Sequence, residues 1–374
     1  MKKKRKNWFI LGGVLLILYG GWLTYLTHRY RPYGWDKLDS LEPEGVYHLH
    51  SRFSDGRGSA EVISRTASQV GLDFIILTDH GRPNFPSLNF QGKKEGIFIF
   101  SGSELSVNRG HLVGLFFPPP AQSFSHRAED AAREIRALGG LTIVAHPYSK
   151  THWSWGEKFI YEGLEICNAD TMVKRNILSL LPYLPLLAFN SRLPLLKILS
   201  SPTRNLRKWD ALNNTRQVYG YYAIDAHLLY KSLFQLFHLH LLLHRPLSSD
   251  FQQAWSQVKA ALKEGRFYNA VEAAAEADGF RFWMTKKSQI FPMGSLIRVS
   301  PPLKLQVEAP FNFAFSVVIR HNGQLFWQGQ SSSITLPINS PGVYRVEVYL
   351  KENSFLDPDF PWILANPIWV EKEN

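Results

Sequence analysis

Seven short apolar runs, separated by polar or helix-like segments, dominate the chain between residues 45 and 225. They are GVYHLH (45–50), LDFIILT (72–78), GIFIFS (96–101), HLVGLFF (111–117), LTIVAH (141–146), GLEICN (163–168) and VYGYYAID (218–225). Two of the intervening segments, 59–71 and 125–140, have helical spacing, contain Ser at the start and end with Gly, as helix caps favour. Strands that alternate with helices predict an α/β domain, and a barrel-like fold is the natural candidate.

The rest of the chain departs from this alternation in three places. From 170 to 214, Leu-rich segments are broken by prolines at 182, 185, 194 and 202, which predicts a helical insertion and argues against a second membrane span. The apolar block 228–247 is interpreted as a lid or a membrane-facing surface, and a helix over 250–265 is expected to begin at Asp250. From 279 to 374, short alternating strands predict a small β-sandwich.

The N-terminus combines a basic cluster, KKKRK within residues 1–7, with an apolar segment over 8–27. The apolar segment carries no charge and would span about 30 Å as a helix, which is the hydrocarbon thickness of a bilayer. A linker follows over 28–44, and its two arginines are outweighed by the basic cluster. The positive-inside rule therefore predicts a single-pass cell-membrane protein with a cytoplasmic N-terminus and an extracytoplasmic catalytic domain. A cleaved signal peptide is the alternative, but its apolar core would be shorter and end in small residues.

Composition narrows the classes of function. The formal net charge is +11, of which five charges belong to the basic cluster, so the modest remainder of +6 gives little support for nucleic-acid binding. No recognisable nucleic-acid module is present, although an oligonucleotide substrate remains open. Cys167 is the single cysteine, which excludes a disulfide framework and a Cys-based zinc site. Any metal must therefore be held by histidines and carboxylates.

Histidines and carboxylates recur where the predicted strands end. His48 and His50 lie two residues apart in the first run, so both side chains project from one face. Seven further candidates fall beside other strands: Asp55, His80, Glu104, His111, His146, Asp225 and His227. A lone histidine is more often a core or surface residue than a metal ligand. Nine candidates that lie beside the predicted strands reverse that expectation. Because barrel strands point their C-terminal ends into one shared mouth, we expect a metal site there.

The ordered motifs HLHSRFSDG, TDH, GSELS followed by GHLVGL, AHPYS and DAH resemble those of the PHP family, the polymerase and histidinol phosphatase superfamily. The similarity covers residues 45–278 and implies a distorted (β/α)7 barrel with two or three divalent ions, which could be zinc, manganese or iron. GVYRVEVYL and PWILANPIWV resemble the C-terminal β-domain of a membrane-associated or secreted branch. Val46 and Gly81 depart from the family pattern, which often has Asp and Asn there.

Carried over residue by residue, the resemblance implies three metal-binding groups. The first metal would be held by His48, His50, Glu104 and Asp225. Glu104 would bridge to a second metal, held also by His111 and His146, and the third would be held by Asp55, His80 and His227. Because all nine positions are occupied, the resemblance implies an active metal-dependent phosphoesterase that uses a metal-bridging hydroxide as its nucleophile.

Four arginines in adjacent loops could bind the remaining phosphate charge, or could equally be solvated: Arg52, Arg57, Arg82 and Arg109. Of these, Arg82 and Arg109 are the preferred candidates. Asp79 could orient a histidine or transfer a proton, and a role as a turn cap is an equal alternative.

The expected substrate is a phosphorylated small molecule or a component of the cell envelope. One alternative is a metal-dependent hydrolase of non-phosphate esters, carbamates or amides, and another is a non-catalytic, metal-stabilised binding protein. His238, His240 and His244 form a further metal-like motif. We disfavour it because no carboxylate is expected close by and its neighbours are Leu and Phe.

Overall fold

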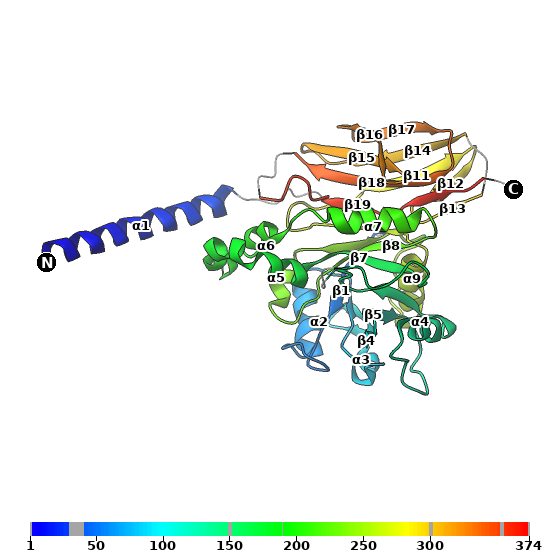
Figure 1. The fold of residues 1–374 in the computed structure, drawn as a ribbon, viewed down its shortest axis with the longest axis horizontal. Coiled ribbons are helices and arrows are strands. Elements are labelled where there is room, and N and C mark those ends of the chain that lie inside the picture. The colour runs from blue at the N-terminus through cyan, green and yellow to red at the C-terminus, as the bar shows by residue number, and fades with distance from the viewer. Residues whose placement is uncertain are drawn as a thin grey trace.

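The computed structural model describes residues 2–29, 41–148, 152–188, 190–298, 302–351 and 355–372. It confirms a mixed α/β fold preceded by one long apolar helix, α1 (Lys2–Arg29), which projects from the body of the molecule (Figure 1). Within α1, Asn7–His28 is long and apolar enough to cross a membrane. Most of the predicted linker, residues 30–40, lies outside the described residues.

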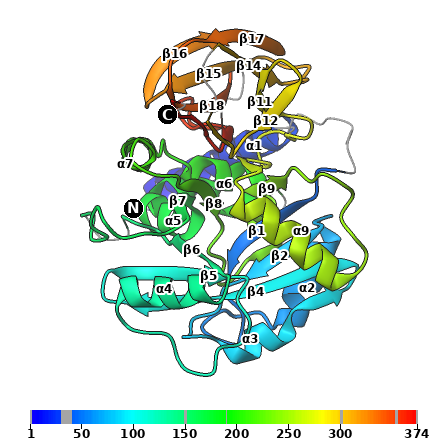
Figure 2. The ribbon, with the colours of Figure 1, turned by 90° about the vertical axis from the view of Figure 1, so that its right-hand side faces the viewer.

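Seven strands in succession form a hydrogen-bonded ring (Figure 2). They are β1 (Glu44–Leu49), β2 (Phe74–Leu77), β4 (Ile97–Val107), β5 (Gly110–Leu115), β6 (Leu141–Val144), β7 (Gly163–Asn168) and β8 (Tyr219–Ala223). Hydrogen bonds from Ile224 N to Tyr47 O and from His50 N to Ala226 O connect the end of β8 back to β1. All seven predicted strands are therefore confirmed. Only β5 runs antiparallel to its two neighbours in the ring.

Helices cover the outside of the ring and begin largely where the capping residues indicate. They include α2 (Ala60–Gln69), α3 (Phe85–Phe90), α4 (Ala128–Ala137) and α9 (Phe251–Lys263). The side chains of Ser59 and Asp250 cap α2 and α9, as expected for residues with short polar side chains. In contrast, α4 begins after Arg127, and Ser125 accepts a hydrogen bond from the Arg127 backbone outside the helix.

The apolar block 228–247 is neither a lid nor a membrane-facing surface over most of its length. It forms the short helix α8 (Tyr230–Leu233) and the strand β9 (His238–Leu241), whose residues are all buried. β9 pairs with the N-terminal end of β1 and with β10 (Phe267–Ala270). Both histidines of β9 are buried together with its two leucines, so its alternating HLHL sequence does not mark one exposed face.

Residues 170–214 are largely helical. They form α5 (Ala169–Leu180), the 3₁₀ helix η1 (Leu181–Ala188), α6 (Arg192–Ile198) and α7 (Thr203–Asn213). Asn168 caps α5, and Asn176 has non-helical backbone angles that kink this helix. Of these elements, η1 contacts α1.

The C-terminal residues form strands in two sheets. One sheet contains β11 (Arg281–Lys286), β12 (Gln289–Pro292), β14 (Leu303–Glu308) and β17 (Ser333–Ile338). The other strands are β13 (Leu296–Ile297), β15 (Phe315–His321), β16 (Gln324–Gly329), β18 (Gly342–Leu350), β19 (Ile363–Ala365) and β20 (Ile368–Val370). Because β19 pairs with β10, these strands continue the sheet that contains the ring, as does β3 (Gly92–Lys94) beside β4.

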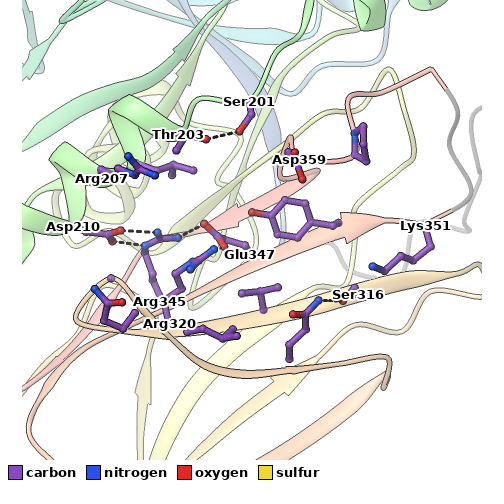
Figure 3. Close-up of a pocket in the computed structure, with 18 residues that line it drawn as sticks. Ser201, Thr203, Arg207, Asp210, Ser316, Arg320, Arg345, Glu347, Lys351 and Asp359 are labelled. Carbon is purple, nitrogen blue, oxygen red and sulfur yellow. Dashed lines mark hydrogen bonds and ion pairs between the residues drawn. The ribbon is translucent and has the colours of Figure 1, made fainter.

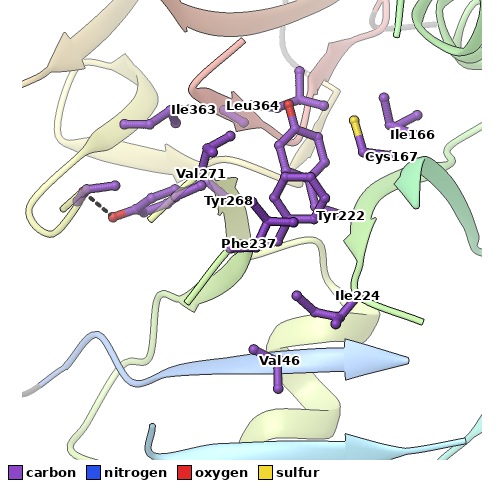
Figure 4. Packing of buried hydrophobic residues seen from close by; sticks show 14 of the residues in the cluster. Val46, Ile166, Cys167, Tyr222, Ile224, Phe237, Tyr268, Val271, Ile363 and Leu364 are labelled. Carbon is purple, nitrogen blue, oxygen red and sulfur yellow. Dashed lines mark hydrogen bonds between the residues drawn. The ribbon is translucent and has the colours of Figure 1, made fainter. Parts of the chain in front are cut away.

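The ring and the C-terminal strands share one apolar core (Figure 4). Tyr222 of β8 and Phe237 pack among residues of β10 and β19, and the Tyr222 hydroxyl donates a hydrogen bond to Pro361 O. Beside this core, a polar cavity of about 780 Å³ lies between α7 and the face of β15, β16 and β18 (Figure 3). At its floor, Arg345 makes two hydrogen bonds to Asp210 of α7. The two parts of the protein are thus joined by both apolar packing and a buried ion pair.

Candidate metal centre

The end of β1 places two buried imidazoles opposite two carboxylates. His48 Nε2 lies 3.3 Å from Glu104 Oε2 and 3.5 Å from Asp225 Oδ1. His50 Nε2 lies 3.2 Å and 3.3 Å from the same two oxygens. Both imidazoles are fully buried, because His48 and His50 turn into the interior of the ring from one strand. This arrangement gives two nitrogen and two oxygen atoms that face a common centre.

Glu104, in β4, is the hub of the site. Its Oε1 lies 2.7 Å from His111 Nδ1 and 2.9 Å from His146 Nε2. Its Oε2 also lies 3.4 Å from His80 Nδ1. His111 is at the beginning of β5, and because β5 is antiparallel its beginning meets the C-terminal ends of its neighbours. The reversal of this one strand explains how a residue at a strand start joins residues at strand ends.

Asp55 brings a third set of histidines together at the outer side of the site. Its carboxylate lies 3.4 Å from His50 Nδ1, 3.6 Å from His80 Nε2 and 3.3 Å from His227 Nε2. The loop that carries Asp55 folds tightly against β1, where a Cβ at Gly56 would lie 2.1 Å from His50 O. Glycine is therefore required for this close approach.

The structure brings all nine sequence-predicted residues into one cluster. Four ring nitrogens in it are buried without a hydrogen-bond partner among the described residues: His48 Nε2, both nitrogens of His50, and His80 Nδ1. Unpartnered buried nitrogens that face carboxylate oxygens fit divalent cations, which His and carboxylate ligands bind readily. Histidine and carboxylate groups also form compact sets of three or four potential ligand atoms here. The assignment of individual residues to individual ions stays a prediction.

Three of the nine residues have strained backbones. His48, His146 and Asp225 have positive φ angles of 71°, 27° and 51°. Positive φ is disfavoured for residues with a Cβ, and such conformations gather at functional sites where the surrounding fold holds them. The fold therefore holds these three side chains in place at the cost of an unfavourable backbone conformation.

Mutual electrostatics control protonation in the cluster. Burial lowers the pKa of His50, but the nearby Asp225 and Glu104 carboxylates outweigh it and raise this pKa to about 9. Burial raises the pKa of Glu104, while His48, His111 and His146 bring it well below its ordinary value. Protons and metal ions compete for the same atoms, so metal binding at this site would release protons.

Glu165 of β7 belongs to the site but was not selected from the sequence. It is fully buried, and its carboxylate lies 2.6 Å from His48 Nδ1 and accepts a hydrogen bond from His146 N. Asn168 donates to both Glu165 and Asp225, which links the two carboxylates. The sequence signal that could have identified Glu165 is that it carries the single charge inside the apolar run GLEICN. Such a carboxylate fixes the orientation of a ligand histidine through its second nitrogen.

Replacing Glu165 with glutamine is expected to lower metal affinity by about 10–100-fold, as for other outer partners of metal ligands. The amide removes the charge that holds His48 while keeping the shape of the side chain. Metal titration followed by competition with a chromophoric chelator measures the change. Glu162→Gln, which alters a neighbouring carboxylate that bonds to Thr142, is the control. Equal affinities in both variants and the wild type would contradict the role of Glu165.

The other predicted catalytic residues occupy different environments. Asp79 is buried and accepts hydrogen bonds from Ser51 N at 2.7 Å and from Ser54 Oγ at 2.7 Å, which is the geometry of a turn cap. Arg109 lies two residues before His111 in the chain, but its Nε donates to Glu129 and its Nη1 donates to Ser154 O. Arg82 Nη1 is buried without a hydrogen-bond partner among the described residues.

The loop arginines nearest to Asp55 also have structural contacts. Arg52 Nε donates to Arg57 O at 2.9 Å, and the Arg57 backbone N–H donates to His227 O at 2.8 Å. These contacts hold the loop together. The role of any of the four arginines in phosphate binding stays a prediction.

A second histidine and carboxylate cluster lies at the opposite end of β1. His238 Nδ1 lies 2.7 Å from Glu44 Oε2, and His240 Nε2 lies 3.0 Å from Glu272 Oε1. Glu42 Oε1 is 3.2 Å from the second nitrogen of His240. The expectation that these histidines have no carboxylate nearby was therefore wrong, because pairing of β9 with β1 and β10 brings distant acids to them. His244 is exposed.

Asp278 at this second cluster is expected to destabilise the fold at high pH. Burial and neighbouring Glu44 raise its pKa to about 6, although His240 opposes the shift. A protein with such an acid loses stability as pH increases from about 4, the unfolded-state pKa, to about 6 and above. Asp278→Asn should therefore raise the thermal midpoint at pH 8 and change little at pH 4. Thermal unfolding at both values, with exposed Asp359→Asn as control, measures this, and a lower midpoint at pH 8 would contradict it.

Comparison with known proteins places the chain among remote relatives. No protein-family model matches it. An uncharacterized protein of Methanocaldococcus jannaschii is 27% identical over 123 residues, which cover 32% of this chain and 71% of that protein. One solved structure is a two-domain protein from Bacteroides vulgatus that contains a predicted PHP-like metal-dependent phosphoesterase. It is 15% identical to this chain, and the match covers 91% of this chain and 99% of that protein with a TM-score of 0.47. An amidohydrolase from Chromobacterium violaceum, with bound sulfate and no metal, is 17% identical, with 49% and 87% covered and a TM-score of 0.33.

Proposed function

We propose that this protein is a membrane-anchored hydrolase of the PHP superfamily that cleaves phosphate esters with the help of divalent metal ions. The observation that carries the proposal is the convergence of five histidines on the single carboxylate of Glu104. Bound divalent ions would activate water near neutral pH and neutralise charge on phosphoryl oxygens. Nine residues, from His48 to His227 along the chain, would hold these ions.

The shape of the cluster supports access by a substrate from one side. His48 and His50 are fully buried at its base, whereas the side chains of Asp55, His111 and His80 are 53%, 34% and 31% exposed at its rim. Burial of the inner side of the cluster excludes water from the inner ligands and fixes their positions, and the exposed rim lets a phosphate group approach. The buried Glu165 and Asn168 hold the inner groups in place without facing solvent.

Membrane anchoring rests on α1. Its large apolar side chains from Trp8 to Trp22 are exposed, and an isolated apolar helix of this length needs a lipid environment. Its last turns are different, because Leu26 is buried against the body and Leu23 packs beside it. The catalytic body would therefore lie close to the membrane surface.

The test uses the full chain in detergent and measures metal content and turnover of phosphomonoester, phosphodiester, carboxyl ester and amide substrates. We expect turnover of at least one phosphate ester, loss of activity on chelation, and recovery on adding zinc or manganese. His146→Ala should lower both metal content and turnover, whereas exposed His126→Ala should leave both unchanged. Turnover of carboxyl esters or amides alone would favour an amidohydrolase. Bound metal without any turnover, unaltered by His146→Ala, would favour a binding protein.

A further inference from the structure

The junction of α5 and η1 exposes an unusual amount of apolar surface. Ile177, Leu178, Leu181 and Leu184 are 46%, 76%, 52% and 42% exposed, and the neighbouring Pro182 and Pro185 are also exposed. We call residues 177–187 the elbow. A single exposed leucine is ordinary, but large apolar residues at spacings of three and four gather on one side of a helix. A gathered apolar surface of this kind marks an interaction site.

The elbow lies directly against the apolar helix α1. The Tyr19 hydroxyl donates a hydrogen bond to Pro182 O at 2.7 Å, and the rings of Trp22 and Tyr183 are 5.5 Å apart. One turn further along α1, Leu26 is buried in the body. Contacts from two successive turns of α1 thus hold the elbow beside this helix.

The position of these contacts along α1 sets the depth of the elbow. Tyr19 precedes His28, the end of the apolar stretch, by nine residues, which correspond to about 13 Å at 1.5 Å per residue. If α1 spans a bilayer whose hydrocarbon core is about 30 Å thick, Pro182 lies within the hydrocarbon of one leaflet. The elbow suits this depth, because its backbone is helical and its prolines lack the N–H groups that lipid cannot satisfy.

The elbow is also close to the metal centre. α5 begins after Asn168, whose side chain donates a hydrogen bond to Asp225 at 3.0 Å, and its 12 residues correspond to about 18 Å. Between the two ends, Lys174 and Arg175 are exposed, Lys174 in an ion pair with Asp170 and Arg175 donating a hydrogen bond to Tyr148 O. Residues 169–198 carry four basic side chains and one acidic side chain, which complements an anionic surface.

Apolar side chains also occur at the rim of the metal centre. Leu228 and Leu229, which directly follow His227, are 43% and 56% exposed. They lie near the elbow, because Leu187 and Lys231 line one shared cavity. The rim therefore offers exposed apolar side chains directly beside the predicted ligand His227.

We propose that the elbow is embedded in the leaflet next to the catalytic body and that the metal centre hydrolyses the phosphate ester of a lipid held in that leaflet. The second half of this inference rests on the proposed phosphoesterase function. Hydrolysis adds water across one P–O bond: the hydroxyl group goes to phosphorus, and the proton goes to the oxygen of the departing alcohol. The diacylglycerol or alcohol portion would stay in or near the membrane.

Insertion of the elbow is tested by its depth in the bilayer, independently of activity. Full-length protein carrying Leu178→Cys is labelled with an environment-sensitive fluorophore and reconstituted into vesicles of phosphatidylcholine and phosphatidylglycerol. Native Cys167 is buried and stays unlabelled. Lipids brominated on the acyl chain should quench this label but not one on Leu325→Cys, which is 58% exposed on β16. Equal, weak quenching at both positions would overturn insertion and favour a protein partner for the elbow.

The lipid substrate is tested by comparing two phosphate esters in the same vesicles. The double variant Leu178→Asp/Leu181→Asp should hydrolyse a fluorescent phospholipid at least about tenfold more slowly, because transfer of both leucines into lipid is lost. Its turnover of soluble bis(p-nitrophenyl) phosphate should be unchanged, which also shows that the variant is folded. Leu325→Asp/Phe326→Asp is the matched control.

The outcomes separate the lipid substrate from the proposed function. Wild-type turnover of the soluble ester alone would overturn the lipid substrate and leave the phosphoesterase assignment intact. Turnover of neither ester would overturn the proposed function, while the quenching result would still decide whether the elbow is inserted.

Discussion

Replacing Glu104 with glutamine is expected to abolish hydrolysis and to lower metal content. Glu104 faces five imidazoles from β1, β5 and the loops after β2 and β6, so its two oxygens lie within 3.4 Å of five of the other eight predicted ligands. Glutamine keeps the volume but removes the charge and one acceptor oxygen. The loss of activity should exceed the about 100-fold that changes in outer partners of metal ligands produce.

Metal analysis and phosphate-ester turnover measure this effect, and thermal unfolding shows whether the variant is folded. Glu95→Gln is a matched control, because it makes the same chemical change at an exposed ion pair with Arg65. A Glu104→Gln variant that keeps its full metal content and its activity would contradict the bridging role of this residue.

Replacing Arg345 with methionine is expected to cause the largest loss of stability. Arg345 is 2% exposed and bonds both to Asp210 of α7 and to Glu347 of β18 (Figure 3). Burial raises the pKa of Glu347, but Arg345 and Arg320 keep it below its ordinary value. Removing one partner of a buried ion pair costs about 3–5 kcal/mol, because the remaining charges lose their compensation.

The sign of the pH dependence follows from the charge that is removed. Without Arg345, the pKa of Glu347 should rise, so the folded variant binds protons more tightly than the unfolded chain does. Its stability should therefore be partly restored at pH 5 and should fall as pH increases to 8. Thermal unfolding at both pH values measures this. Arg320→Met is the milder control, since Arg320 is partly exposed and Arg345 still pairs with Glu347. Equal thermal midpoints for the Arg345 variant and the wild type would show that the ion pair is dispensable.

Local sequence patterns predicted the seven strands of the ring correctly. Strands such as β2 and β6 are four-residue apolar runs, rich in β-branched residues and too short for a helix, which favours buried strands. The caps at Ser59 and Asp250 were equally predictable, because a short polar side chain satisfies amide groups two or three residues away. The nine candidate ligands could be identified because strand ends meet at one edge of the ring.

Only the tertiary structure could identify the partners that lie far apart in the sequence. The strand β9 was misread because pairing with β1 and β10, which lie far away in the sequence, buries its histidines as well as its leucines. In the sequence Glu165 is an isolated charge, and only the folded structure shows that β7 places it against His48, which is 117 residues away. Likewise, His240 meets Glu42 and Glu272 only after three strands assemble.

The sequence by itself determined where strands and helices form and which histidines and carboxylates stand at the strand ends. These features depend on backbone periodicity and on contacts between residues close in the chain, which a single sequence displays directly. Tertiary packing decided which acid orients which histidine. It also decided the contact of the elbow with α1. Both depend on the relative placement of elements separated by tens to hundreds of residues, which local periodicity does not encode.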